Sequence, residues 1–389
     1  MMKNPISTRI LNVFPLFLVM YEISNYLAND AYLPAMPEMA DQLNTTNHLV
    51  QLTLTAFFLG NATMQLILGP ISDRYGRRVV LLGGGLVFIT TTLICAFSTN
   101  IYGLLIARYF QGSAVTSMIV AGYATVHAMY DHVRAIKTLA WMNSITILAP
   151  AVGPIFGAMI LLMGDWRWIF MLLAIWASVA LLILYRVMPE TCETTSQISL
   201  KKMMDQYWRL LTNWQFVKPT LASGLLFAAM IAWIAAGPFL VVDSFHHSAL
   251  TFGWIQALIF GSFMLGTRVV SKMIHTVSIE KITKISIGSA FLGGLLSLVC
   301  SVVFPNHLID IVLPMMILAL GSGIGFPVFN RMAVEGSEES MGVKVALFSS
   351  FMGVSGLLGS IMISSFYDGS VLGFSSVIFG FMTILLLLP

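Results

Sequence analysis

Two carboxylates stand inside the first long apolar stretch of the chain, in the segment Tyr21-Glu-Ile-Ser-Asn-Tyr-Leu-Ala-Asn-Asp30. A charge at the depth of a lipid bilayer costs at least a few kcal/mol, so such residues usually face a cavity on a substrate or proton path. On a helix, the step from Glu22 to Asp30 is a rise of about 12 Å and a net turn of about 80°. The two acids can therefore line one cavity at two depths, with Tyr26 and Asn29 between them. The alternative is that one carboxylate, Asp30 in particular, ends the span near water.

A third charge, Arg108, lies in the apolar context Leu105-Ile-Ala-Arg108-Tyr-Phe-Gln111-Gly112. A carboxylate whose proton affinity depends on a nearby arginine can bind a proton in one state and release it in another. We therefore take Asp30, Glu22 and Arg108 as the candidate proton-coupling residues. The alternative is that the long side chain of Arg108 extends to the outer membrane surface.

The composition places these charges in a membrane protein. Of 389 residues, 58% are hydrophobic and only 10% are charged, whereas about a quarter are charged in soluble domains. The net charge of +3 does not suggest nucleic acid as a partner. The three cysteines have no framework spacing, which argues against a disulfide scaffold and a cysteine metal site.

Apolar segments of about 20 residues, the length that crosses a bilayer, recur along the whole chain and predict an all-α protein with twelve membrane helices. The first segment follows a short polar start without a small-residue cleavage site, so we interpret it as a retained span. A polar linker over 189–218 separates an N-terminal half, 1–188, from a C-terminal half, 219–389. The predicted spans are 11–34, 50–72, 79–97, 103–127, 138–163, 167–188, 219–242, 252–273, 283–304, 309–330, 343–367 and 371–389.

Lysine and arginine predict the orientation, because they concentrate in cytoplasmic loops. With both termini in the cytoplasm, Arg167 is the only basic residue in the outer loops, and Arg108 lies inside a predicted span. All other basic residues fall on the inner side: Lys3, Arg9, Arg74, Arg77, Arg78, Arg134, Lys137, Arg186, Lys201, Lys202, Arg209, Lys218, Arg268, Lys272, Lys281, Lys284, Arg331 and Lys344.

The linker mixes charges with large apolar residues between Ser196 and Lys218. This pattern predicts an amphipathic helix on the inner membrane surface, joining two halves of similar size as in transporters built from repeats. A plain cytoplasmic connection is the alternative.

The loop after the second span reads Gly69-Pro-Ile-Ser-Asp73-Arg74-Tyr-Gly76-Arg77-Arg78 and resembles the signature loop of the major facilitator superfamily. Its glycines allow a tight turn, and Asp73 can accept hydrogen bonds from a helix N-terminus or an arginine. We expect this cluster to lock the two halves together on the cytoplasmic side. Membrane anchoring alone would explain the arginines but not Asp73 or the spaced glycines. The corresponding segment of the second half, Gly266-Thr-Arg268-Val-Val-Ser-Lys272, lacks the acid.

The fifth span contains Ala149-Pro150-Ala-Val-Gly153-Pro154-Ile-Phe-Gly157-Ala158, which is similar to the antiporter motif of drug/proton exporters. Gly153, Pro154 and Gly157 match that motif, whereas Ala149 stands where a glycine is usual. Small residues let helices approach closely, and proline bends them.

Taken together, the chain resembles twelve-helix drug/proton antiporters of the superfamily, nearest to the MdfA-like multidrug exporters and more distantly to the Bcr/CflA-like ones. The motif around Arg108 also resembles that of the superfamily's fourth helix. The resemblance assigns the MdfA-like acid pair to Glu22 and Asp30 and the matching arginine to Arg108. For any one pocket aromatic or methionine, plain packing is an equally good interpretation. The pocket positions it implies are Glu22, Tyr26, Asn29, Asp30, Tyr123, Met142, Trp233 and Phe260.

The resemblance implies a proton-coupled exporter of lipophilic, often cationic drugs, monomeric, in the bacterial inner membrane, and not an enzyme. A dedicated exporter or a symporter of an endogenous metabolite such as a siderophore is the alternative, and a membrane sensor without transport is a third. No Gly-x-x-x-x-Gly-Lys-Ser/Thr loop is present, so we expect no nucleotide drive. We expect no cofactor. His246 and His247 beside Asp243 do not predict a metal site, because adjacent loop histidines rarely converge on one ion.

Overall fold

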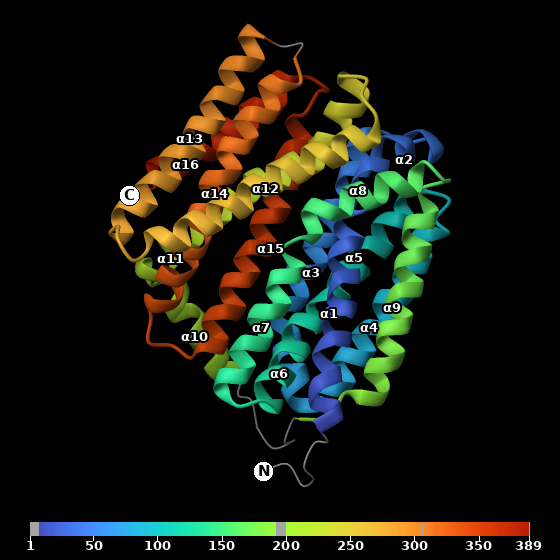
Figure 1. Cartoon of the computed structure of the whole chain (residues 1–389), viewed down its shortest axis with the longest axis vertical. Helices are drawn as coiled ribbons and strands as arrows, with labels where there is room; N and C mark the ends of the chain where they lie inside the picture. Colours follow the sequence, from blue (N-terminus) through green and yellow to red (C-terminus); the bar gives the residue numbers. More distant parts are fainter. Residues whose placement is uncertain (1–7, 192–199, 305–306, 389) are drawn as a thin grey trace.

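The computed structural model describes residues 8–191, 200–304 and 307–388, and these are helical almost throughout, without a strand. Nine apolar helices or joined helices in this described part are long enough to cross a membrane, and α16 is a shorter apolar helix. Each of the predicted spans coincides with one helix or with two or three consecutive helical elements. The architecture is therefore the expected all-α membrane fold of two helical halves (Figure 1).

The N-terminal half contains α1 to α9. Its members are α1 (Thr8–Asp30), η1 (Leu33–Ala35), α2 (Met36–Gln42), α3 (Asn47–Tyr75), α4 (Arg77–Ala96), α5 (Ile101–Ser117), the π-helical η2 (Met118–Gly122), α6 (Tyr123–Met129), α7 (His132–Thr146), α8 (Ala149–Leu161) and α9 (Arg167–Val187).

The linker helix α10 leads to the C-terminal half. The bounds are α10 (Leu200–Leu211), α11 (Trp214–Phe239), the π-helical η3 (Leu240–Ser244), α12 (Ala249–Met273), α13 (Ile279–Val303), α14 (Ile309–Glu335), α15 (Met341–Phe366) and α16 (Val371–Leu387).

Local sequence explains where several helices begin and break. The side chains of Thr46 and Asn100 accept backbone N–H bonds in the first turns of α3 and α5, which satisfies donors that lack a helical partner. The fifth span, predicted as one segment, is divided into α7 and α8. Pro150 stands in the first turn of α8, where its missing N–H is tolerated best.

The two halves meet at the end of the bundle that carries α2, which we call the α2 end; the opposite end carries α10 (Figure 1). The His48 ring nitrogen Nδ1 lies 2.6 Å from the Ser364 carbonyl oxygen, and Thr55 and Ser360 share a 2.6 Å hydrogen bond between their hydroxyls. A Cβ added at Gly353 of α15 would lie 2.9 Å from the Ala62 Cβ of α3. Here α3 and α15 pack backbone to backbone.

Helix α12 makes the other large contact between the halves, against α8. A Cβ added at Gly253 would lie 3.1 Å from the backbone of Ile155. This contact brings the C-terminal half next to the glycine-rich segment of the fifth span.

The linker helix α10 belongs to the C-terminal half by its contacts. Arg209 forms a 2.6 Å ion pair with Glu339, and the Gln206 amide donates to the same carboxylate at 3.0 Å. Tyr207 and Leu210 are buried, whereas Met204 and Trp208 on another face are exposed. This two-faced pattern is that of an amphipathic helix. The linker residues 192–199 lie outside the described part, as do the side chains of Lys201 and Lys202.

The Thr55–Ser360 pair permits a direct test of this contact. In a background with Cys95, Cys192 and Cys300 replaced by serine, we expect Thr55→Cys with Ser360→Cys to form a disulfide on oxidation, because hydroxyls 2.6 Å apart place the two side chains within disulfide reach. The bond should hold the halves together on a non-reducing gel after protease cleavage at a site placed in the linker. Thr55→Cys alone is the control. Absence of a cross-link in membranes would contradict this α3–α15 contact.

Candidate functional site

Helix α1 carries both carboxylates into the interior of the N-terminal half. Glu22 is 1% exposed and Asp30, the last residue of α1, is 2% exposed. Asp30 therefore ends its helix without reaching solvent, because η1 and α2 continue the chain beyond it. Tyr26, one turn from each acid, is 38% exposed, so this stretch of α1 borders accessible space.

Glu22 is bonded to the predicted pocket residue Tyr123. The Tyr123 hydroxyl lies 2.5 Å from Glu22 Oε1 and 3.1 Å from Asn143 Oδ1 of α7. Tyr123 is the first residue after the π-helical turn η2. Because a π turn holds an extra residue, it changes which side chain faces α1; such turns are frequent at functional sites. The second carboxylate oxygen of Glu22, Oε2, is buried without a hydrogen-bond partner.

Asp30 sits at the contact between α1 and the glycine-rich segment of α8. Its Oδ1 accepts a 3.0 Å bond from Asn29 Nδ2. A Cβ added at Gly153 would lie 2.8 Å from the Asp30 Cβ, and one added at Gly157 would overlap the Ala31 carbonyl oxygen. The small residues of the predicted antiporter motif thus permit α8 to cover Asp30.

Arg108 is fully buried, so its side chain does not extend to the membrane surface. The guanidinium carbon lies 4.3 Å from the Tyr32 ring centre and 4.6 Å from that of Phe57, which are cation–π distances. Its Nη1 donates to the Ala28 carbonyl at 2.8 Å and to Gln111 Oε1 at 2.6 Å. Gln111 in turn donates to Thr92 of α4 at 2.7 Å.

The other edge of Arg108 is unused in this conformation. Its Nε and Nη2, the parallel pair of donors that suits a carboxylate, are buried without a partner. Asp30 is within electrostatic range of the guanidinium, but the two side chains form no ion pair or hydrogen bond with each other. The site therefore holds a buried acid and a vacant donor edge that are close but not joined.

The remaining predicted pocket residues are placed less directly. Met142 of α7 is fully buried in the apolar core. Trp233 is also fully buried: it donates to Gln256 Oε1 at 2.7 Å and packs against Phe252. Phe260 is partly buried beside Phe263 of the same helix. Substrate contact by Met142 and Trp233 remains a prediction that needs a change of conformation.

The signature loop is held within the N-terminal half. Gly76 has φ of +101°, a conformation that glycine adopts without strain. The backbone N–H groups of Arg77 and Arg78 donate to the Glu190 carboxylate at 3.0 and 3.1 Å. The Arg77 guanidinium donates to the Ala124 carbonyl at 2.9 Å.

These contacts tie α4, α6 and the end of α9 together, so in this conformation they do not join the two halves as expected from the sequence. Arg74 lies over the Tyr75 ring at 5.3 Å, and Gly69 faces open space. The side chain of Asp73 lies outside the described part.

The sequence did not predict the contact of Asn143 with Tyr123 or the contact of Gln111 with Arg108. Both Asn143 and Gln111 are uncharged amides, and a single amide in an apolar span is a weaker signal than a charge. Asn25 was also missed: it is 2% exposed, and neither its amide nitrogen nor its amide oxygen has a partner. Buried polar atoms that lack a hydrogen-bond partner are typical of positions that hold a water molecule or serve a function.

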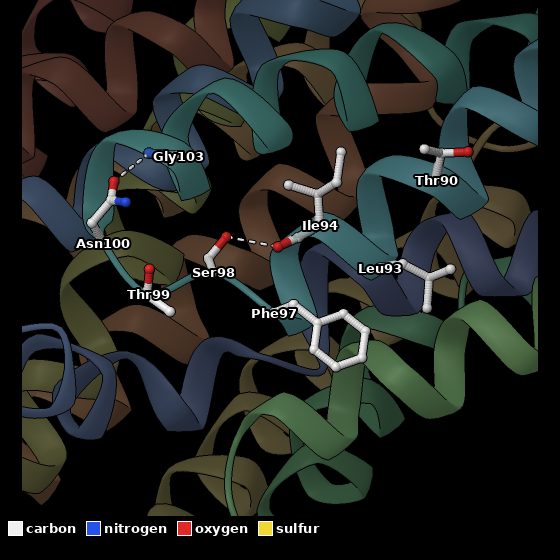
Figure 2. A pocket seen from close by; sticks show the side chains of 8 residues that line it. All are labelled: Thr90, Leu93, Ile94, Phe97, Ser98, Thr99, Asn100 and Gly103. Carbon is white, nitrogen blue, oxygen red and sulfur yellow. Dashed lines mark hydrogen bonds between the residues drawn. The ribbon is translucent and has the colours of Figure 1, made fainter.

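Other features of the described residues do not compete with this site. No group of three His, Cys, Asp or Glu side chains converges as metal ligands would within that part of the chain. A surface hollow of about 470 Å³ lies between α4 and α5. Figure 2 shows side chains that line it, among them Ile94, Ser98 and Asn100. The polar groups drawn there serve the local turn, Asn100 accepting from Gly103 N–H and Ser98 donating to Ile94. No titratable residue lines the hollow.

Residues 18–360 match the family described as the Major Facilitator Superfamily. The chain belongs to this superfamily. As a superfamily member it is a multi-pass membrane protein and a transporter of small molecules, not an enzyme, which confirms the fold and the class of function expected from its motifs.

Named relatives extend the match over most of the chain. It is 31% identical to the chloramphenicol resistance protein CraA of Acinetobacter baumannii over 354 residues, 90% of this chain and 85% of that protein. It is 30% identical to the multidrug transporter MdfA of Escherichia coli O6:H1 over 331 residues, 85% of this chain and 81% of that protein.

Solved structures of other transporters share the fold. A bacterial homologue of the lysosomal transporter Spinster, in an inward-facing conformation, aligns with a TM-score of 0.75 at 12% identity, over 98% of this chain and 96% of that one. A D-xylose–proton symporter aligns with a TM-score of 0.73 at 14% identity, over 96% and 97%. At such identities the likeness concerns the fold alone.

The contact between α8 and α1 makes a prediction about Gly157. Gly157→Ala should force α8 away from Ala31, at a cost of about 1–3 kcal/mol as for other overpacked sites, and should lower the thermal midpoint of the purified protein. Gly380→Ala in α16, where an added Cβ meets nothing within 4 Å, is the matched control. Equal midpoints for the two variants would show that the close α1–α8 contact does not stabilise the protein.

Proposed function

We propose that this protein exports lipophilic, often cationic drugs or other toxic compounds from bacterial cells in exchange for protons, by alternating access between its two halves. The names of the relatives, a chloramphenicol resistance protein and multidrug transporters, support the substrate class. Two buried carboxylates and a buried arginine in one half are the single observation that carries the proposal. A scaffold or sensor would have no use for the cost of burying them.

Asp30 is the residue to which we assign the coupling proton, with Arg108 as its electrostatic partner. When Asp30 is ionised, its carboxylate can occupy the vacant Nε and Nη2 edge of Arg108 after a small rearrangement of α1. When Asp30 is protonated, that attraction is lost and the carboxyl group keeps its bond with Asn29. Proton binding and helix position are coupled in this way.

Glu22 is the residue to which we assign the recognition of cationic compounds. Its Oε2 has no partner within the protein, and Tyr26 beside it adds an exposed aromatic face for cation–π contact. A lipophilic cation near Glu22 would neutralise the buried charge. Neutral compounds remain compatible, because the coupling proton is carried by Asp30.

The distribution of basic residues supports an orientation with both termini in the cytoplasm of a bacterial inner membrane. Arg74, Arg134, Lys272 and Arg331 lie at the α10 end, whereas Arg167 lies at the α2 end, and basic residues favour the cytoplasmic side. With this orientation the halves meet on the outer side, which corresponds to a conformation that loads substrate from the cytoplasm. We propose a monomer as the transporting unit.

Asp30→Asn provides the first test of coupling. The amide cannot carry a titrating proton, so we expect efflux of a lipophilic dye cation driven by a pH gradient across proteoliposomes to fall to the background of empty liposomes. Arg268→Gln, on an exposed part of α12, is a control for charge removal elsewhere. Gradient-dependent efflux by the Asp30→Asn variant would exclude Asp30 as the coupling residue. Absence of gradient-dependent efflux by the unaltered protein would overturn the proposed function.

Glu22→Gln should separate recognition from coupling. Contacts to a charged group are worth about 1.5–3 kcal/mol, so the KM for a monovalent lipophilic cation should rise by roughly tenfold or more while proton-driven transport of neutral compounds persists. The measurement is KM and kcat for one cation and one neutral drug under the same gradient. Loss of all transport, as for Asp30→Asn, would refute this division between the two acids.

A further inference from the structure

The hydroxyl of Tyr123 has more acceptors than protons. It lies 2.5 Å from Glu22 Oε1 and 3.1 Å from Asn143 Oδ1, and its single proton can be given to only one of them at full strength. The second short distance must therefore be satisfied by a proton that another group supplies. Only Glu22, when it is protonated, or Asn143, through its Nδ2, can supply one.

The charge on Glu22 decides which solution holds. An ionised Glu22 only accepts, so Tyr123 donates to it, and the Asn143 amide is best turned with Nδ2 toward the phenol oxygen. Its oxygen then faces away from Tyr123. A protonated Glu22 donates to the phenol oxygen, which releases the Tyr123 proton for Asn143 Oδ1 and leaves Nδ2 facing away. The two distances, 2.5 Å to Glu22 Oε1 and 3.1 Å to the Asn143 amide, fit either arrangement, because the two differ only in proton positions and in the turn of the amide.

Two further observations place this choice at a binding surface. Asn143 is exposed, so the amide atom that faces away from Tyr123 is accessible to a ligand. Glu22 is 1% exposed and its Oε2 has no partner, so the carboxyl group has an unused position for a proton or a cation. Among the other titratable groups of α1, Tyr26 interacts electrostatically with Glu22 and Tyr123, and Asp30 interacts with Tyr26.

The buried titratable groups of the neighbouring helices α4 and α5 lie near the Asp30 end of α1, away from Glu22. Arg108 of α5 and Cys95 of α4 lie beside Tyr32. Glu22 is therefore the charged group that contacts the Tyr123 hydroxyl directly.

We propose that Glu22, Tyr123 and Asn143 form a hydrogen-bond switch that decides which class of compound the site accepts. With Glu22 protonated, Asn143 presents an N–H donor and the site suits neutral compounds that carry a carbonyl or nitro oxygen. With Glu22 ionised, the N–H donor of Asn143 is withdrawn toward Tyr123, and the charge of the Glu22 carboxylate suits the site to cations. This inference rests on the proposed drug export and extends it to a second substrate class.

The test uses two probes on the detergent-solubilised full chain. Chloramphenicol is neutral and carries amide and nitro oxygens, whereas tetraphenylphosphonium is a permanent cation without any hydrogen-bonding group. Asn143→Leu keeps the approximate size of the side chain and removes both polar atoms. We expect the Kd for chloramphenicol to rise between about twofold and tenfold, the worth of one neutral hydrogen bond, with the Kd for tetraphenylphosphonium unchanged.

Ser144→Ala is the matched control, because Ser144 is the exposed neighbour whose hydroxyl bonds only its own helix, at the Trp141 carbonyl. This variant should leave both Kd values unchanged. Equal weakening of the two probes by Asn143→Leu would indicate a structural role and overturn the inference, as would no effect on chloramphenicol.

A pH series examines the switch itself. In the unaltered protein, the ratio of the chloramphenicol Kd to the tetraphenylphosphonium Kd should rise with pH, because deprotonation of Glu22 removes the donor form and creates the anion. The same series in Asp30→Asn removes the charge of the other buried acid, and the ratio should still rise with pH. Tyr123→Phe removes the hydroxyl that connects the Asn143 amide to Glu22. The chloramphenicol Kd of this variant should therefore no longer rise with pH, whereas its tetraphenylphosphonium Kd should still fall with pH.

A pH-dependent chloramphenicol Kd in Tyr123→Phe that matches the unaltered protein would overturn the inference. Efflux from proteoliposomes separates this result from the proposed function: binding that follows the switch without gradient-driven efflux would refute export alone. Efflux of both probes without the Asn143 effect would refute the switch alone, and failure to bind either probe would refute both.

Discussion

The burial of a guanidinium charge is the constraint on which the N-terminal half depends. Arg108 is removed from water completely, and an unsolvated charge of this kind is stable only with close compensation. The rings of Tyr32 and Phe57 supply it at cation–π distances, and the Ala28 carbonyl and Gln111 supply it at one edge. These contacts fix α1 against α5 at Ala28, between Glu22 and Asp30. The position of both acids therefore follows from the accommodation of one arginine.

Close backbone approach is the second condition, and glycine provides it. Any side chain at Gly157 would overlap the Ala31 carbonyl, and Gly153 lies directly beside Asp30. The same α8 segment meets Gly253 of α12 on its other side. In the proposed alternating access, a shift of the C-terminal half against α8 would change how α8 covers Asp30, which would link the motion between the halves to the exposure of a carboxylate.

The charged part of the site could be predicted from the sequence, because Glu22, Asp30 and Arg108 stand out against apolar spans of the correct length. The division of the fifth span at Pro150 and the π turn before Tyr123 could not, since both depend on how the helices pack. The pairing of Tyr123 with Glu22 and Asn143 depends on this π turn, so the sequence alone does not indicate it. The lock between the halves expected at the signature loop stays a prediction, because Arg77 and Arg78 bond Ala124 and Glu190 of their own half in this conformation and the side chain of Asp73 lies outside the described part.

All of the buried ionisable groups of the site belong to one half, and this has a mechanical consequence. Buried polar side chains of the C-terminal half, such as Trp233 and Gln256, are neutral: Trp233 donates to Gln256 Oε1 at 2.7 Å, and Gln256 Nε2 has no partner. If Asp30 and Arg108 were divided between the halves, each cycle would have to separate two opposite charges in a low-dielectric interior, which costs several kcal/mol. With both charges in one half, the other half can move across them without separating them. The charges then change only their access to water and their proton, which is a far smaller free-energy step.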